Sequence, residues 1–184
     1  MTMKSLKTMF IHGLLVLGLL CGSLPLANAA YEPEPFKRPP RMPIAFLYEL
    51  MDAEKQAEEG DAEQQYYVAG LYYEGEKVMK DRVKAFDLYK KAATQGHVQS
   101  QTQLALMYLD GEVVRQDLGE YIKWLKKAAA QKYSYAENML GISYENGTGV
   151  RKDYAIAKEW YGKSCDGGDK RGCYEYKRLN EKGY

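Results

Sequence analysis

Proline is missing from most of this sequence. One of its six prolines is Pro25, the other five fall between Pro33 and Pro43, and residues 44–184 contain none. Because proline interrupts helices, its absence permits long helices over residues 44–184. The proline-rich segment at residues 30–43 predicts an extended linker, and a docking peptide for an SH3-like groove is the alternative.

Residues that usually carry catalysis or bind metals are also few. The sequence has two histidines, His12 and His97, and three cysteines, and it contains no S-x-x-K, K-T-G or H-E-x-x-H motif. Nothing in this pattern activates a nucleophile or provides the spacing of a metal-ligand set. We therefore expect a non-catalytic protein that uses no metal and no cofactor.

The N-terminal residues have the pattern of a secretory signal peptide. A basic start, MTMKSLK, precedes a short apolar run, and the small residues ANA at 27–29 offer a cleavage site. A retained membrane anchor is the alternative, but the run is short and is interrupted by Gly13 and Gly18. We expect cleavage after about residue 29, export to the periplasm or beyond, and no stable membrane insertion afterwards.

No charge of one sign dominates the remaining chain. Without residues 1–29, 24 lysines and arginines stand against 25 acidic residues, and the signs are interspersed. Such a chain lacks the basic surface of a nucleic-acid-binding protein and the polybasic segment that binds a membrane surface. We therefore expect no nucleic acid among its partners.

A 36-residue repeat organises the rest of the chain. The segments YYEGEKVMKD, YLDGEVVRQD and YENGTGVRKD begin at Tyr72, Tyr108 and Tyr144. A fixed period of this size is typical of arrays of helical hairpins. The third segment could be taken for a phosphate-binding loop, but Gly149 has no counterpart in the other two and no strand pattern precedes it. The period therefore predicts an all-α fold.

Recurring residues mark where the helices of each unit end and begin. Glycine follows the first helix and aspartate precedes the second: Gly75, Gly111, Gly147, Asp81, Asp117 and Asp153. These are the residue types of a left-handed C-terminal cap and of a side-chain N-cap. Asp117 and Glu120 also have the spacing of a capping box. Glycine closes the second helix of the units, with Lys132 as the exception.

The pattern resembles the Sel-1-like repeat family, a relative of the tetratricopeptide repeats. The family motif is most complete at Ala136, Leu140-Gly141, Tyr144, Gly147-Thr-Gly149-Val150, Asp153, Ala157, Trp160-Tyr161 and Lys163. The resemblance implies a right-handed α-solenoid that binds other proteins. We expect repeats at 61–96, 97–132 and 133–168, a capping helix at 44–60, and a half repeat at 169–184 that completes the domain 44–184.

Two cysteines flank the turn between the last two predicted helices. Cys165 ends one helix and Cys173 begins the next, so a disulfide could join them in an oxidising compartment. A free thiol pair for redox or metal chemistry is the alternative. The spacing is similar to that of the secreted, cysteine-rich branch of the family, and this resemblance implies a disulfide.

The resemblance also implies where a partner binds. First helices line the groove of such arrays, and the tetratricopeptide groove pattern selects positions in each of them. These positions are Glu63, Tyr66, Gly70, Tyr73, Gln99, Thr102, Leu106, Leu109, Tyr135, Asn138, Ile142, Glu145, Arg171, Tyr174 and Arg178. Tyrosine and arginine are common in binding hot spots, although some of these side chains could instead complete the packing between helices.

Three functional classes remain open from the sequence. We expect an exported module that binds a peptide, a partner protein or cell-wall material in its groove. The alternatives are an immunity or inhibitor protein with one dedicated target, and an enzyme, because secreted cysteine-rich relatives have been linked to β-lactam binding and hydrolysis. The missing motifs disfavour the enzyme.

Overall fold

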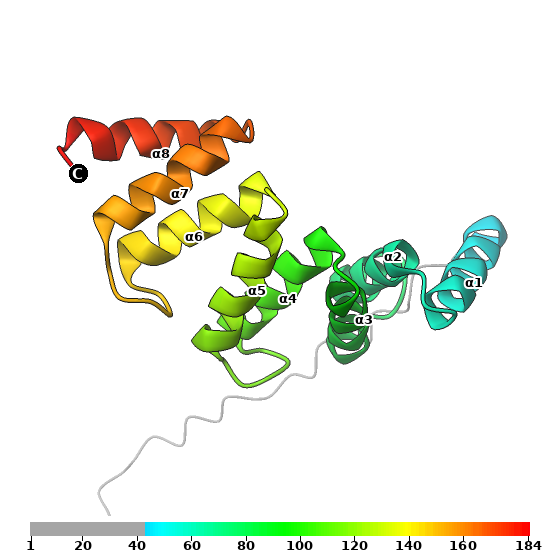
Figure 1. Cartoon of the computed structure of the whole chain (residues 1–184). Coiled ribbons are helices and arrows are strands. Elements are labelled where there is room, and N and C mark those ends of the chain that lie inside the picture. The colour runs from blue at the N-terminus through cyan, green and yellow to red at the C-terminus, as the bar shows by residue number, and fades with distance from the viewer. Residues whose placement is uncertain (1–42) are drawn as a thin grey trace, which may run out of the picture. The chain divides into compact units, whose positions relative to one another are not determined.

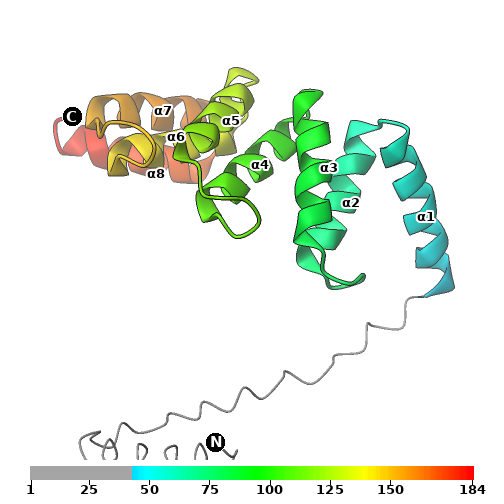
Figure 2. The ribbon, with the colours of Figure 1, turned by 90° about the horizontal axis from the view of Figure 1, so that it is seen from below.

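The computed structural model describes residues 43–184, and within this range it contains α-helices and no strand. The helices are α1 Ile44–Glu58, α2 Ala62–Glu74, α3 Arg82–Thr94, α4 Val98–Asp110, α5 Leu118–Ala130, α6 Ser134–Asn146, α7 Tyr154–Asp166 and α8 Lys170–Glu181. Each helix packs against the next one along the chain, and α6 also contacts α8 (Figures 1 and 2). The all-α fold is confirmed. The predicted signal peptide and nearly all of the predicted linker lie outside the described residues.

The loop between the two helices of each unit has the predicted caps. Asp81, Asp117 and Asp153 each accept a hydrogen bond from the backbone N–H three residues ahead, at 2.9, 2.9 and 3.0 Å. The glycines at the end of the first helices have φ angles of 71°, 72° and 81°, a region that costs other residues conformational energy. The same loop is therefore built three times.

The capping box predicted at Asp117 and Glu120 is wrong in its second half. The Asp117 side chain caps the helix, but the Glu120 carboxylate accepts hydrogen bonds from Lys123 and Trp124 instead of reaching back. The Asp117 backbone N–H is already bound to the carbonyl of Tyr108 at 3.0 Å, so it needs no second partner.

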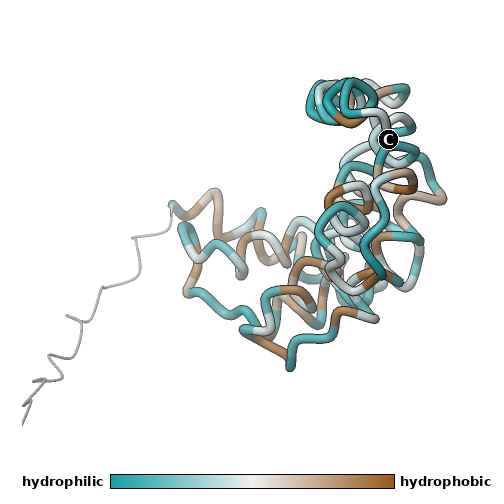
Figure 3. The backbone as a smooth tube through the Cα atoms, turned by 90° about the vertical axis from the view of Figure 1, so that its left-hand side faces the viewer, coloured by the Kyte–Doolittle hydropathy of each residue, from teal (hydrophilic) through white to brown (hydrophobic). Residues whose placement is uncertain are grey.

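Small and apolar side chains fill the space between the helices. Leu104, Leu125 and Leu140 have no exposed surface, and alanines such as Ala105 and Ala128 lie where neighbouring helices approach closely. In Figure 3 apolar and polar residues are interspersed along the described chain, as expected for helices that turn one face to the core and another to solvent.

The last helix, α8, is a half repeat that packs on α7 and α6. Leu179 is fully buried beside Tyr161, and Gly172 lies so close to Ser164 that a Cβ atom there would be 2.7 Å from the serine Cβ. A disulfide joins Cys165 in the last turn of α7 to Cys173 in the first turn of α8, with a Cα–Cα distance of 4.4 Å. The predicted cysteine pairing is confirmed.

Candidate functional site

Six of the residues predicted to bind a partner line a single cleft between α6 and α8. The cleft has a volume of about 500 Å³. The six residues are Asn138, Ile142, Glu145, Arg171, Tyr174 and Arg178. The sequence reasoning missed four other lining residues: Asn146, Tyr161, Lys170 and Glu175. Lys170 and Glu175 are sequence neighbours of predicted residues, whereas the repeat motif had assigned Tyr161 to packing.

Asn138 has an unusual position at the wall of this cleft. Its side chain is only 4% exposed, and its Nδ2 atom has no hydrogen-bond partner among residues 43–184. A buried amide N–H without an acceptor costs about 1–3 kcal/mol, so such groups are rare in folded proteins. Because the Nδ2 atom itself is fully buried, a carbonyl or carboxylate oxygen of a ligand would reach it only after the amide turns toward the cleft.

An ion pair joins the two helices along one side of the cleft. Arg178 of α8 donates to both carboxylate oxygens of Glu145 at 2.6 and 2.7 Å, and Tyr161 donates to the same group at 2.9 Å. Burial opposes ionisation of Glu145, but the hydrogen bonds from Arg178 and Tyr161 outweigh burial and lower its pKa. Glu145 and Arg178 therefore hold α8 in place and have little capacity left for a ligand.

Three of the four exposed residues that line the cleft are basic or aromatic, namely Lys170, Arg171 and Tyr174, and the fourth is Asn146. Tyr174 is 68% exposed, and the Arg171 guanidinium lies 5.5 Å from the centre of the Tyr135 ring. Arg171 also lies 3.7 Å from Asp169, a distance too long for strong pairing at an exposed site. These side chains offer a partner both an aromatic surface and a positive charge.

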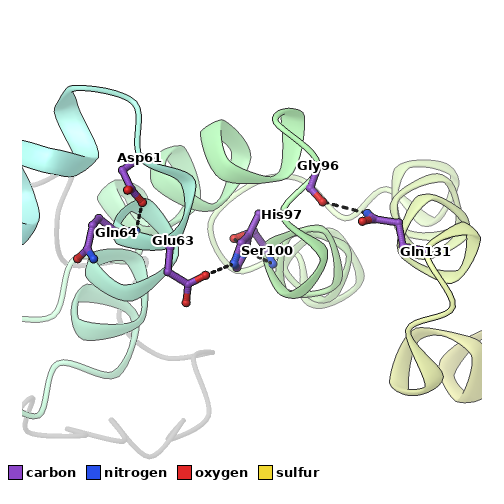
Figure 4. A network of polar contacts seen from close by, with 7 residues as sticks. All are labelled: Asp61, Glu63, Gln64, Gly96, His97, Ser100 and Gln131. Carbon is purple, nitrogen blue, oxygen red and sulfur yellow. Dashed lines mark hydrogen bonds and ion pairs between the residues drawn. The ribbon is translucent and has the colours of Figure 1, made fainter. Parts of the chain in front are cut away.

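Three predicted residues in α2 lie in other contacts, two of them with His97 and one with Tyr89. The imidazole of His97 lies 4.8 Å from the Tyr66 ring and 3.1 Å from a Glu63 oxygen (Figure 4). His97 Nδ1 accepts a hydrogen bond from the Ser100 backbone N–H, so the histidine is the N-cap of α4. Tyr73 packs edge-on against another tyrosine. The sequence reasoning missed this role of His97, which occupies the register position of the capping residue Asp61.

Three predicted residues in α4 are buried or half-buried and contribute to the packing between helices. Thr102 is 2% exposed and donates to the carbonyl of Val98 at 3.2 Å, so it has almost no free surface for a partner in this structure. Leu106 and Leu109 are half-buried and pack against the core. Their packing follows from the position of α4, which has neighbouring helices on both sides.

Other kinds of site are not found in the described part of the chain. Residues 43–184 contain no group of three or more histidine, cysteine or acidic residues arranged to hold a metal ion. Within the same range, no helix combines the length and the apolar character needed to cross a membrane.

Comparison with known proteins agrees with this architecture. The Sel1 repeat model matches residues 62–97, 98–133 and 134–169, one residue later than the repeats expected from the sequence and more than half of the chain in total. No match was found among curated proteins.

Several solved structures are similar. A Sel1 repeat protein from Oxalobacter formigenes is 32% identical over 71% of this chain and 98% of its own, with a TM-score of 0.65. A protective antigen of uropathogenic Escherichia coli is 27% identical over 73% of this chain and 36% of its own, with a TM-score of 0.56. Cysteine rich protein B of Helicobacter pylori shares the fold, with 20% identity over 68% of this chain and 92% of its own, and a TM-score of 0.57. The chain therefore belongs to the Sel1 repeat family.

Proposed function

We propose that this protein binds a partner protein by taking an extended segment of it into the cleft between α6 and α8. Sel1 repeats typically act as protein–protein interaction modules, which supports this class of function. The observation that carries the proposal is the Nδ2 atom of Asn138, a buried donor without a partner among residues 43–184, on a residue that lines the cleft. A backbone carbonyl of the bound segment would accept this hydrogen bond once the Asn138 amide turns into the cleft.

The other lining residues favour a segment of particular composition. Ile142 is half-buried and Tyr174 is exposed, so they offer apolar and aromatic surface for one or two side chains of the partner. Lys170 and Arg171 are exposed at the start of α8. An acidic residue near one end of the segment would complement their charge.

We further propose that the protein works outside the cytoplasm. The signal-peptide pattern of residues 1–29 and the Cys165–Cys173 disulfide are consistent with each other, because disulfides persist mainly in oxidising compartments. Sequencing the N-terminus of the exported protein tests this step. An intact Met1 on exported material would contradict it.

Photo-crosslinking can test the cleft because α8 provides a matched control. Tyr174 lines the cleft, whereas Tyr176 is 41% exposed on the same helix and packs near Gly162 of α7. Replacing each in turn with a photoreactive phenylalanine should give a defined crosslinked partner from position 174 and little from position 176. Equal products from both positions would refute binding in the cleft.

Asn138→Leu separates binding from folding. Leucine removes the unsatisfied amide from a buried position, so the variant should unfold at the same or a higher denaturant concentration. The same variant should lose most of the crosslink from position 174, because the partner loses its hydrogen-bond donor. Unchanged crosslinking in a folded Asn138→Leu protein would show that the amide is not the contact.

A further inference from the structure

Glutamine side chains repeat at the interfaces between consecutive units. Gln65 of α2 donates from Nε2 to the carbonyl of Ala57 at 2.9 Å, and Gln101 of α4 donates to the carbonyl of Ala93 at 3.1 Å. The two glutamines are 36 residues apart and are 3% and 5% exposed. Each therefore satisfies a backbone carbonyl at the end of the preceding unit.

A second glutamine completes each of these interfaces. Gln95 donates from Nε2 to Oε1 of Gln65 at 2.9 Å, and Gln131 donates to Oε1 of Gln101 at 2.9 Å. The Gln131 amide also donates to the carbonyl of Gly96 at 2.9 Å (Figure 4). One primary amide thus contacts two acceptors, a side-chain oxygen and a backbone carbonyl.

Both glutamines are replaced at the third interface. Glu137 stands in register with Gln101, and Gly167 stands in register with Gln131. Glu137 is 5% exposed, yet no side chain among residues 43–184 forms a hydrogen bond or ion pair with its carboxylate. An ionised carboxylate cannot donate to the carbonyl of Ala129, and glycine has no side chain to donate to the carboxylate.

The missing side chain leaves an open cleft. The space between α5, α6 and α7 measures about 630 Å³, and Glu137 and Gly167 are among its lining residues. The corresponding cleft between α1, α2 and α3 measures about 200 Å³, and Gln65 does not line it because Gln95 lies against that residue. The Glu137 carboxylate, which stands where the other interfaces have a glutamine amide covered by a second glutamine, is thus accessible from the cleft between α5, α6 and α7. This cleft shares no lining residue with the proposed partner site.

We propose that this cleft binds a primary carboxamide, in the position that the Gln131 side chain occupies at the preceding interface. One amide hydrogen would bond to the Glu137 carboxylate, and the other to the carbonyl of Lys132, which corresponds in register to that of Gly96. The carbonyl oxygen of the ligand would accept from Lys163, whose Nζ lies 4.0 Å above the Trp160 ring at the edge of the cleft.

An amide fits this cleft better than an ammonium group does. Lys126, Lys132 and Lys163 line it together with two acids, Glu137 and Asp166, so a cationic ligand enters surroundings with a net positive charge. A neutral amide avoids that repulsion and can use both its donor and its acceptor. The amide belongs either to a free small molecule or to a glutamine or asparagine side chain of a protein.

Chemical-shift titration of the purified, disulfide-bonded protein tests the proposal. The probes are free L-glutamine, the peptide acetyl-Gly-Gln-Gly-N-methylamide, and the same peptide with Glu in place of Gln. A carboxamide probe should shift the backbone amides near Glu137 and Gly167. The Glu peptide should bind at least about tenfold more weakly, because it loses both N–H donors and brings a like charge to the carboxylate.

The two carboxamide probes distinguish the sources of the ligand. Binding of L-glutamine alone assigns the cleft to a small molecule, and binding of the Gln peptide assigns it to a protein side chain. No shift with either carboxamide, or equal binding of the Gln and Glu peptides, overturns the proposal.

Two variants identify the contacts within the cleft. Glu137→Met removes the acceptor and should abolish the shifts, while its helical spectrum stays that of the wild type. The double variant S134G/G167Q supplies the missing glutamine from the chain itself and should also exclude the probe. Ser134→Gly is its matched control, because a Cβ atom at Gly167 would otherwise lie 2.8 Å from the Ser134 Cβ. Carboxamide binding retained by Glu137→Met would also overturn the proposal.

Discussion

Replacing Glu137 with glutamine should stabilise this protein, although the change touches one buried side chain. At the two preceding interfaces a glutamine in this register donates to a backbone carbonyl of the preceding unit at 2.9 and 3.1 Å. Glu137→Gln restores the same donor opposite the carbonyl of Ala129 and removes a buried negative charge. One such hydrogen bond contributes about 1 kcal/mol, and the unfolding free energy at pH 7 should rise by at least that amount.

The size of this gain should depend on pH in a defined direction. Burial raises the pKa of the Glu137 carboxyl above its ordinary value of 4.5. The charges of Lys163 and Lys132 lower this pKa and that of Asp166 raises it, but burial has the largest effect. The folded protein therefore holds the proton more tightly than the unfolded chain does. Wild-type stability should fall as the pH rises from about 4.5 through the pKa of the folded state. The glutamine variant has no carboxyl at this position and does not lose stability for this reason. Its stability advantage over the wild type should therefore widen over the same pH window and stay constant above it.

Urea unfolding followed by circular dichroism between pH 4 and pH 8 measures both effects. Glu159→Gln is the matched control, because Glu159 is exposed on α7 and its replacement should change little at any pH. A Glu137→Gln protein that is less stable than the wild type at pH 7 would refute the reasoning. An advantage that does not change with pH would refute the part that concerns the carboxyl proton.

Three further variants probe the packing of α6, α7 and α8. Cys173→Ser removes the disulfide that closes a loop with a sequence separation of 8, and the lost cross-link should lower the unfolding free energy by about 2.5 kcal/mol. Hydrogen exchange should accelerate mainly in α8, and unchanged exchange there would contradict this. Glu145→Gln weakens the contact with Arg178 and should lower stability by about 1 kcal/mol at pH 7. Because the pKa of Glu145 is lowered in the folded state, this loss should shrink as the pH falls from about 4.5 and vanish below the lower pKa of the folded protein. A loss that persists at still lower pH would argue against it. Gly141→Ala should destabilise by about 1–3 kcal/mol despite the better helix propensity of alanine, because the new Cβ would lie 2.5 Å from the Tyr161 ring; a raised melting temperature would contradict this.

The features that the sequence predicted well depend on local geometry. A glycine with a positive φ or an aspartate that caps a helix is required by the backbone within a few residues, so the 36-residue spacing located every loop. Lys132 shows how strong this local requirement is. It takes a φ of 60° where the other units have glycine, and it is the one non-glycine residue with a positive φ among residues 43–184.

The exposure of the groove residues could not be predicted in the same way. Tyr66, Thr102, Asn138 and Tyr174 share one register position, yet Thr102 and Asn138 are buried while Tyr174 is 68% exposed. The difference arises because inner helices have neighbours on both sides and α8 does not. Exposure at this position is therefore a property of the assembled array and not of the single helix.

Glu137 was also missed, although the signal was present in the sequence. The 36-residue alignment places it after Gln65 and Gln101, and places Gly167 after Gln95 and Gln131. Two coordinated departures from a repeated pair indicate a changed interface. The hydrogen bonds that give those departures their meaning became apparent only from the structure.

The loops that join the helices have a consequence for how such a chain can change its length. In all three, the aspartate backbone N–H is bound to the carbonyl of a tyrosine nine residues earlier, at Tyr72, Tyr108 and Tyr144, over 2.9 to 3.0 Å. Each loop is therefore closed by a hydrogen bond within its own unit, and a single inserted or deleted residue would break this hydrogen bond. Removal or duplication of 36 residues at equivalent points would leave the hydrogen bond of every remaining loop intact. A gene for this fold can thus grow or shrink by whole units while each surviving loop keeps its length.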